Sequence, residues 1–103
     1  ESWADALRRE FLEELGIAPV IGGAPIVLEN IYDHRGQTGH EIVFAAEIAL
    51  QEAALPEGAC LSFCENDGTR CLARWYPLEA FTAGRLRLLP DRLLDRLSGR
   101  EVR

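Results

Sequence analysis

The first seventeen residues, ESWADALRREFLEELGI, predict a helix whose acids stand in an unusual place. At about 100° per residue, Trp3, Leu7, Phe11 and Leu15 form one apolar stripe, and Glu14 falls inside the same stripe. A carboxylate that faces a protein core is costly unless a cation or hydrogen bonds compensate it. This segment therefore constrains the fold, because the helix must bury its stripe beside a group that neutralises Glu14.

Three of these acids have the spacing of a metal site. Glu10, Glu13 and Glu14 lie at positions i, i+3 and i+4, which are neighbours on a helix surface. Hard divalent cations such as Mg²⁺ prefer oxygen ligands. The helix is therefore predicted to hold a divalent ion. Its start is expected near Trp3, because Ser2 begins a capping-box pattern, and its end at Gly16.

The same segment resembles the signature of the Nudix hydrolases, G-x5-E-x7-R-E-U-x-E-E-x-G-U, in which U is a bulky apolar residue. Residues 31–48, 73–81 and 88–97 resemble, more loosely, the hairpin, the Trp-bearing strand and the closing helix of that family. The opening glycine of the signature would precede the first residue, so the chain is expected to lack the N-terminal portion of the domain. The positions that match the signature are Glu1, Arg9, Glu10, Phe11, Glu13, Glu14, Gly16 and Ile17.

The resemblance implies a fold and an activity. The fold would be α+β, an α/β/α sandwich with a mixed β-sheet between helices, formed by residues 1–103 as a single domain without its N-terminal portion. The activity would be hydrolysis of the pyrophosphate in a nucleoside diphosphate linked to another moiety, with Mg²⁺ or Mn²⁺ as the cofactor. The implied partner is a nucleotide-type small molecule.

The resemblance also implies roles for individual residues. Glu10, Glu13 and Glu14 would be the metal ligands, with Glu13 and Glu14 acting in catalysis. Glu1 would steady the ligands, and Arg9 would fix the local geometry by pairing with an acid. The helix-ending Gly16 would be structural.

A general base is expected from a loop outside the signature. Glu65, just before the turn at Asn66-Asp67-Gly68, is the first candidate, and Glu57 and Glu52 follow it. The ordinary alternative for each is a solvent-exposed acid. Tyr32 and Tyr76 are further candidates, as groups on which a base could stack.

Composition restricts the partners. The net charge of -6 argues against a nucleic-acid surface, which should be basic. No apolar run approaches the roughly 20 residues of a membrane span, and a cytoplasmic location is expected. Cys60, Cys64 and Cys71 match no zinc-binding spacing and are interpreted as reduced thiols.

The remaining pattern predicts short strands and two further helices. Strands are expected over 26–33 and 41–50 around a turn at 34–39, and residues 42–46 read as buried on both faces. A buried strand needs neighbours, so an open sheet edge or a homodimer is expected. Phe44 and Trp75 are expected in the core. A hairpin of 61–64 with 70–76, a helical turn after Pro77 and a helix from Pro90 to Leu97, ended by Gly99, complete the set.

Two other readings stay open. One is a Nudix-like nucleotide-binding or regulatory module without hydrolysis. The other is a structural metal site on an interaction domain.

Overall fold

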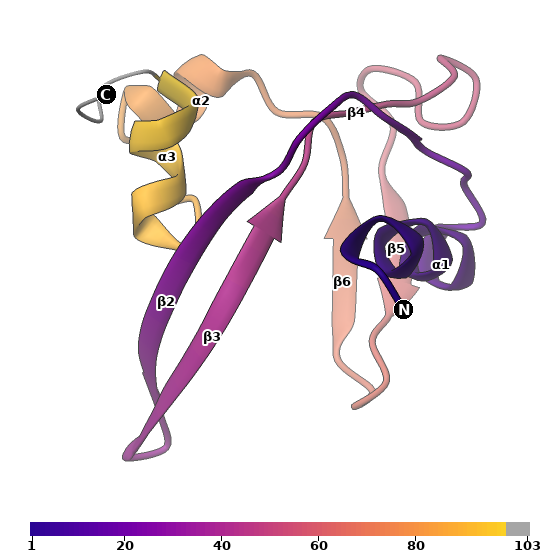
Figure 1. Cartoon of the computed structure of the whole chain (residues 1–103). Coiled ribbons are helices and arrows are strands. Elements are labelled where there is room, and N and C mark those ends of the chain that lie inside the picture. The colour runs from indigo at the N-terminus through magenta and orange to yellow at the C-terminus, as the bar shows by residue number, and fades with distance from the viewer. Residues whose placement is uncertain (99–103) are drawn as a thin grey trace. The chain divides into compact units, whose positions relative to one another are not determined.

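The computed structural model describes residues 1–98, and the chain divides into two compact units (Figure 1). The first unit contains Glu1–Gly23 and Glu47–Trp75. The second contains Ala24–Ala46 and the chain from Tyr76 onward. Each unit is therefore built from two segments that are distant in sequence.

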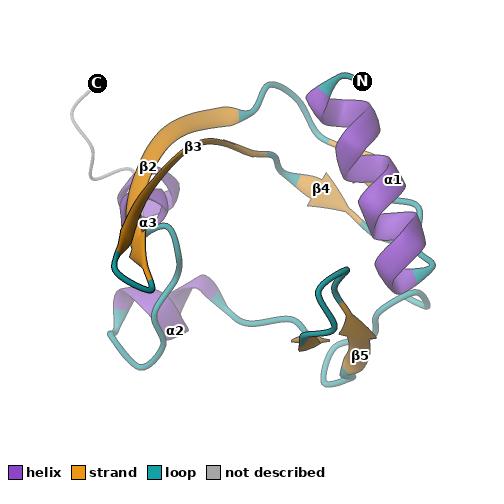
Figure 2. Ribbon diagram, turned by 90° about the horizontal axis from the view of Figure 1, so that it is seen from below, coloured by secondary structure: helices purple, strands orange, loops and turns teal. Residues whose placement is uncertain are grey.

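The first unit places a helix on a small hairpin. Helix α1 (Trp3–Leu15) packs against β5 (Leu61–Cys64). Strand β5 pairs antiparallel with β6 (Arg70–Ala73), and β1 (Val20–Ile21) pairs antiparallel with β4 (Ile48–Ala49). Figure 2 shows α1 as the helix that follows the N-terminus.

Both ends of α1 follow the prediction from the sequence. Ser2 is the N-cap, and its Oγ accepts a hydrogen bond of 3.1 Å from the backbone N–H of Asp5. Gly16 has φ of 69° and ends the helix in the left-handed region, where its N–H donates to the carbonyl of Leu12. The next residue, Ile17, is buried at 7% exposure. The glycine therefore turns the chain so that an apolar side chain enters the core.

The core of the first unit is small. Leu55 is buried at 7% exposure, and its carbonyl accepts a hydrogen bond of 2.6 Å from Nε1–H of Trp75. Trp75 itself remains 47% exposed, so its expected place in the core is wrong. The indole N–H is satisfied by this carbonyl, while much of the ring stays exposed.

The second unit is built on a longer hairpin. Strand β2 (Ile26–His34) pairs antiparallel with β3 (Gln37–Ala45) over nine residues each. The connection has two residues, Arg35 and Gly36, both with positive φ (53° and 79°), as a type I′ hairpin turn requires. The expected turn over 34–39 was too long because Arg35 accepts the left-handed conformation.

Two helices complete the second unit. Helix α2 (Leu78–Thr82) follows Pro77, and α3 (Asp91–Ser98) follows Pro90, as predicted. Helix α3 contacts both α2 and β2. The expected role of Gly99 in ending α3 lies outside the described residues.

The two faces of the β2–β3 hairpin differ in burial. Leu28 is 3% exposed, so the sheet is covered at that position. On the opposite face, Ile42 is 53% and Phe44 is 49% exposed. The prediction that residues 42–46 are buried on both faces, with Phe44 in the core, is therefore wrong. Among the described strands, β3 pairs only with β2. The face that carries Ile42 and Phe44 is open to solvent.

The α+β character is confirmed, with helices and small antiparallel sheets. Within residues 1–98 the strands form three separate antiparallel pairs, so the expected mixed sheet is not formed there. The open sheet edges that were expected are present, because each described strand pairs on one side. No helix within this range has the length and apolar character needed to cross a membrane.

Replacing Gly16 tests how α1 ends. Among the described residues nothing lies within 4 Å of a Cβ built at Gly16, so a side chain there costs backbone strain without a clash. We expect Gly16→Ala to lower the free energy of unfolding by about 1 kcal/mol, measured by urea unfolding followed by circular dichroism. Gly16→Asn should cost less, because asparagine tolerates this conformation. An alanine variant as stable as the wild type would contradict this account of the helix end.

Candidate functional site

Arg9 joins the acids at the start and middle of α1. Its Nε donates to Oε2 of Glu1 at 2.8 Å and its Nη2 to Oε1 of Glu1 at 3.0 Å, a two-point contact. Its Nη1 donates to Oε2 of Glu13 at 3.2 Å, and Nη2 lies 4.0 Å from Oε1 of Glu10. One guanidinium thus lies beside three of the carboxylates that match the Nudix signature.

The contact with Arg9 changes the acidity of Glu1. The hydrogen bond from Arg9 favours the carboxylate and lowers the pKa of Glu1 below its ordinary value. The hydrogen bond and charge of Glu1, followed by the charge of Glu13, raise the pKa of Arg9. The pairing predicted for Arg9 is present. Its two-point contact ties the residue before the N-cap to the middle of the helix.

Glu14 does not face the core. It is exposed, whereas Phe11 and Leu15 of the apolar stripe are half-buried. The expected desolvation cost therefore does not arise. Helix α1 packs on a hairpin of short strands, which covers part of the stripe and leaves its margin open.

Two of the candidate acids, Glu14 and Glu65, affect the acidity of Cys71. This half-buried thiol of β6 has a pKa raised first by burial, then by the charge of Glu65 and a hydrogen bond with it, and then by the charge of Glu14. Asp67 adds a smaller effect of the same sign. Glu14 comes from α1 and Glu65 from the connection that follows β5, and α1 packs against β5.

The β5–β6 connection is held by local hydrogen bonds. The N–H of Glu65 donates to the carbonyl of Thr69 at 2.9 Å, and the N–H of Gly68 donates to the carbonyl of Glu65 at 2.9 Å. The N–H of Thr69 also donates to Oδ1 of Asp67 at 2.9 Å, and hydrogen bonds from Thr69 lower the pKa of Asp67. The predicted turn at Asn66-Asp67-Gly68 is therefore present, and it fixes the backbone of Glu65.

The acids of α1 are of the ligand type that divalent ions prefer, but their side chains do not converge on one point. Glu10, Glu13 and Glu14 are exposed carboxylates, which are the ligands that Mg²⁺ or Mn²⁺ prefers. One oxygen of Glu13 already accepts from Arg9. Within residues 1–98, no group of three or more histidine, cysteine, aspartate or glutamate side chains is arranged to hold a metal ion.

The other predicted candidates lie apart from this group in sequence and are exposed. Glu52 and Glu57 are exposed in the segment between β4 and β5. Tyr32 and Tyr76 belong to the second unit. Cys60, Cys64 and Cys71 are free thiols, as interpreted from the sequence.

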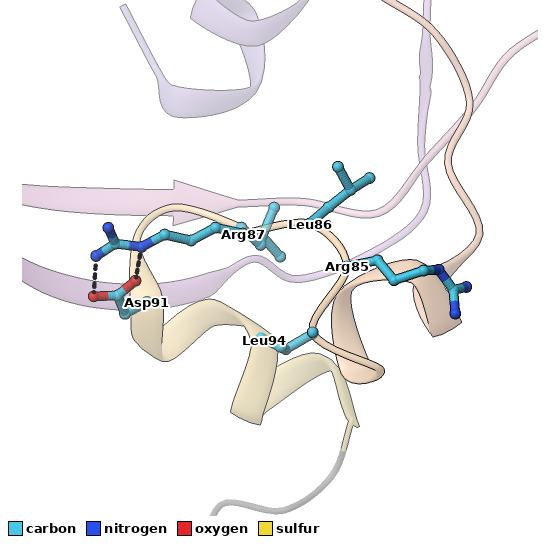
Figure 3. A pocket seen from close by; sticks show the side chains of 7 residues that line it. Arg85, Leu86, Arg87, Asp91 and Leu94 are labelled. Carbon is cyan, nitrogen blue, oxygen red and sulfur yellow. Dashed lines mark hydrogen bonds and ion pairs between the residues drawn. The ribbon is translucent and has the colours of Figure 1, made fainter.

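The second unit contains a hollow that the sequence analysis did not identify. It has a volume of about 460 Å³ (Figure 3). Arg87 makes a two-point contact with Asp91, at 3.0 and 2.9 Å, and Arg85 pairs with Glu79. Both cations are thus neutralised by neighbours. The alternation of arginine and leucine over 85–88 is the signal that could have pointed to it. Its lining residues are Gly84, Arg85, Leu86, Arg87, Leu88, Asp91 and Leu94.

Comparisons of the chain with protein-family models, with curated proteins and with solved structures found no match.

The acidity of Cys71 reports on the carboxylates around it. We expect Glu65→Gln and Glu14→Gln each to lower the pKa of Cys71, because each removes a negative charge that disfavours the thiolate. At a fixed pH near the ordinary cysteine value, Cys71 should then react faster with iodoacetamide. The measurement is the pH dependence of alkylation in a background with Cys60 and Cys64 replaced by serine.

Glu57→Gln is the control, since Glu57 is not among the groups that shift Cys71. Equal alkylation profiles for wild type, Glu14→Gln and Glu65→Gln would show that these two side chains do not approach the thiol.

Proposed function

We propose that the chain is a Nudix-type hydrolase that cleaves the pyrophosphate of a nucleoside diphosphate linked to another moiety. The observation that carries the proposal is the arrangement of acids on α1. Glu10, Glu13 and Glu14 follow the spacing of the Nudix signature. Arg9 and Glu1, which also match it, make a two-point contact with each other, and the resemblance gives both of them supporting roles.

The position of Glu65 gives further support. A general base outside the signature has to approach the acidic helix. Helix α1 packs against β5, which leads directly into the connection that carries Glu65, and the charges of Glu65 and Glu14 both raise the pKa of Cys71. Glu52 and Glu57 have no comparable link to α1 among the interactions of the described residues.

The proposed roles follow from these positions. Glu10, Glu13 and Glu14 would hold Mg²⁺ or Mn²⁺, which would neutralise phosphate charge and make a bound water more acidic. Arg9 positions Glu13 through its hydrogen bond of 3.2 Å. Glu65 would act as the general base and accept the proton that the attacking water loses. The proposed fold is the Nudix sandwich, with a mixed sheet between helices.

One observation favours a second candidate. Within residues 1–98, no carboxylates are gathered into a group that could hold a metal ion. A nucleotide-binding module that does not hydrolyse its ligand needs no such group. Product formation separates the two candidates, since a binding module retains intact nucleotide without turnover.

Substitution of Glu14 tests the hydrolase. With Mg²⁺ or Mn²⁺ present, a panel of diphosphate-linked nucleosides should yield a nucleoside monophosphate, and EDTA should stop the reaction. We expect Glu14→Gln to reduce kcat by about 100-fold or more, the order of effect of removing one electrostatic group from an active site. The rate is measured by chromatography of the products.

The matched control is Asp5→Asn, which removes an acid from the same helix. Asp5 pairs with Arg8 at 3.3 Å on the first turn, outside the signature positions. It should retain the wild-type rate. Hydrolysis by Glu14→Gln at the wild-type rate would refute the assignment of Glu14, and absence of product from every substrate would favour the binding module.

A further inference from the structure

The side chain of Asp67 holds the connection that carries Glu65. Its Oδ1 accepts a hydrogen bond of 2.9 Å from the backbone N–H of Thr69. The carbonyl of Thr69 in turn accepts the N–H of Glu65, also at 2.9 Å. Thr69 is therefore held on its N–H side by Asp67 and on its carbonyl side by Glu65. The carboxylate of Asp67 thus stabilises the residue with which the backbone of Glu65 pairs.

The hydrogen bonds from Thr69 also favour the charged form of Asp67. They lower the pKa of Asp67 below its ordinary value, because a hydrogen bond donated to a carboxylate stabilises the carboxylate. A charged acceptor makes a stronger hydrogen bond than a neutral one. At neutral pH the connection is therefore held by a charge-assisted hydrogen bond, although Asp67 is exposed.

The pairing of β5 with β6 does not depend on Asp67. The two strands pair over four residues each, and the last pair before the connection is Cys64 with Arg70. Asp67 lies beyond that pair and makes its hydrogen bond within the connection. Loss of this hydrogen bond should therefore loosen the connection and leave the hairpin paired.

We propose that Asp67 is a positioning residue, which restricts the backbone of Glu65 for proton transfer. This inference rests on the proposed hydrolysis, in which Glu65 is the general base. A base contributes only when it lies within hydrogen-bond reach of the proton that it removes. A small misplacement of a reacting group is costly in rate. Asp67 acts through Thr69 and Glu65 and not on the substrate.

Steady-state kinetics with a diphosphate-linked nucleoside and Mg²⁺ test the proposal. Asp67→Ala should lower kcat about tenfold and change KM little, because a loosened connection misplaces the base without removing it. Asp67→Asn keeps an oxygen acceptor at the same place and should restore most of the rate. Combined with Glu65→Gln, the alanine substitution should lower kcat no further, since a residue that acts only through Glu65 has nothing left to position.

The matched control is Asp33→Ala. Asp33 is an exposed aspartate that also bonds to a threonine near a hairpin turn, since its Oδ1 accepts from Oγ1 of Thr38 at 3.0 Å. This variant loses a comparable hydrogen bond in the second unit and should retain the wild-type kcat.

Amide hydrogen exchange in EDTA, followed by nuclear magnetic resonance, tests the hydrogen bonds without any activity. Asp67→Ala should speed exchange at the N–H groups of Thr69 and Glu65 and leave the paired residues of β5 and β6 unchanged. Unchanged exchange at Thr69 and Glu65 would overturn the proposal.

The kinetic outcomes separate this role from the proposed function. If the wild type hydrolyses its substrate and Asp67→Ala is equally fast, the positioning role is overturned and the hydrolysis stands. An equal loss of kcat with and without Glu65→Gln would also overturn the role, because it would show a general weakening of the fold. Absence of product from the wild type would refute the hydrolysis and the role together.

Discussion

The packing of α1 on β5 is the contact on which the candidate site depends. Phe11 and Leu15 are half-buried on the helix while Glu14 stays in solvent. The acids therefore lie on a helix that packs against β5, the strand that leads into the connection carrying Glu65, and the charges of Glu65 and Glu14 both raise the pKa of Cys71. If α1 were displaced from the hairpin, its acids would stay together on the helix, but the proposed base Glu65 would no longer be carried next to it.

Arg9 is the cation that contacts the acids Glu1 and Glu13 at α1. Arg9 contacts Glu1 at two points and Glu13 at one, which offsets part of the repulsion among acids on neighbouring turns. Exposed ion pairs are worth little individually. The contacts of Arg9 matter for geometry, because they restrict the side chain of Glu13 and hold Glu1, which precedes the N-cap.

The local elements of this chain could be predicted from the sequence, and their packing could not. Ser2 and Gly16 determine the ends of α1 through a side-chain acceptor and a left-handed backbone, both of which act within a few residues. The apolar content of 42–46 indicated a strand correctly but suggested burial on both faces. Burial depends on which elements cover the sheet, and the residues of the strand itself do not determine that. Phe44 is therefore half exposed although its segment is apolar.

The candidate site shows the same division. The sequence analysis placed Glu10, Glu13 and Glu14 on one helix, as the structure has them. It also predicted that Arg9 pairs with an acid, and Arg9 contacts Glu1. The wheel placed Glu14 in the apolar stripe, but it did not show how much of that stripe the hairpin covers. The two-residue turn at Arg35 and Gly36 sets the register of the β2–β3 hairpin, in which Tyr32 pairs with Gly39. The sequence analysis expected a longer turn and so did not give this register.

Binding of Mn²⁺ followed by nuclear magnetic resonance tests the central claim, that the acids of α1 hold a divalent ion beside the β5–β6 connection. Paramagnetic broadening falls steeply with distance, so substoichiometric Mn²⁺ reports which amides lie nearest to it. The account predicts that amide signals of residues 10–16 and 65–71 broaden first, and that excess Mg²⁺ restores them. Broadening that begins in the β2–β3 hairpin or in α3, or that spreads uniformly over the chain, would contradict it.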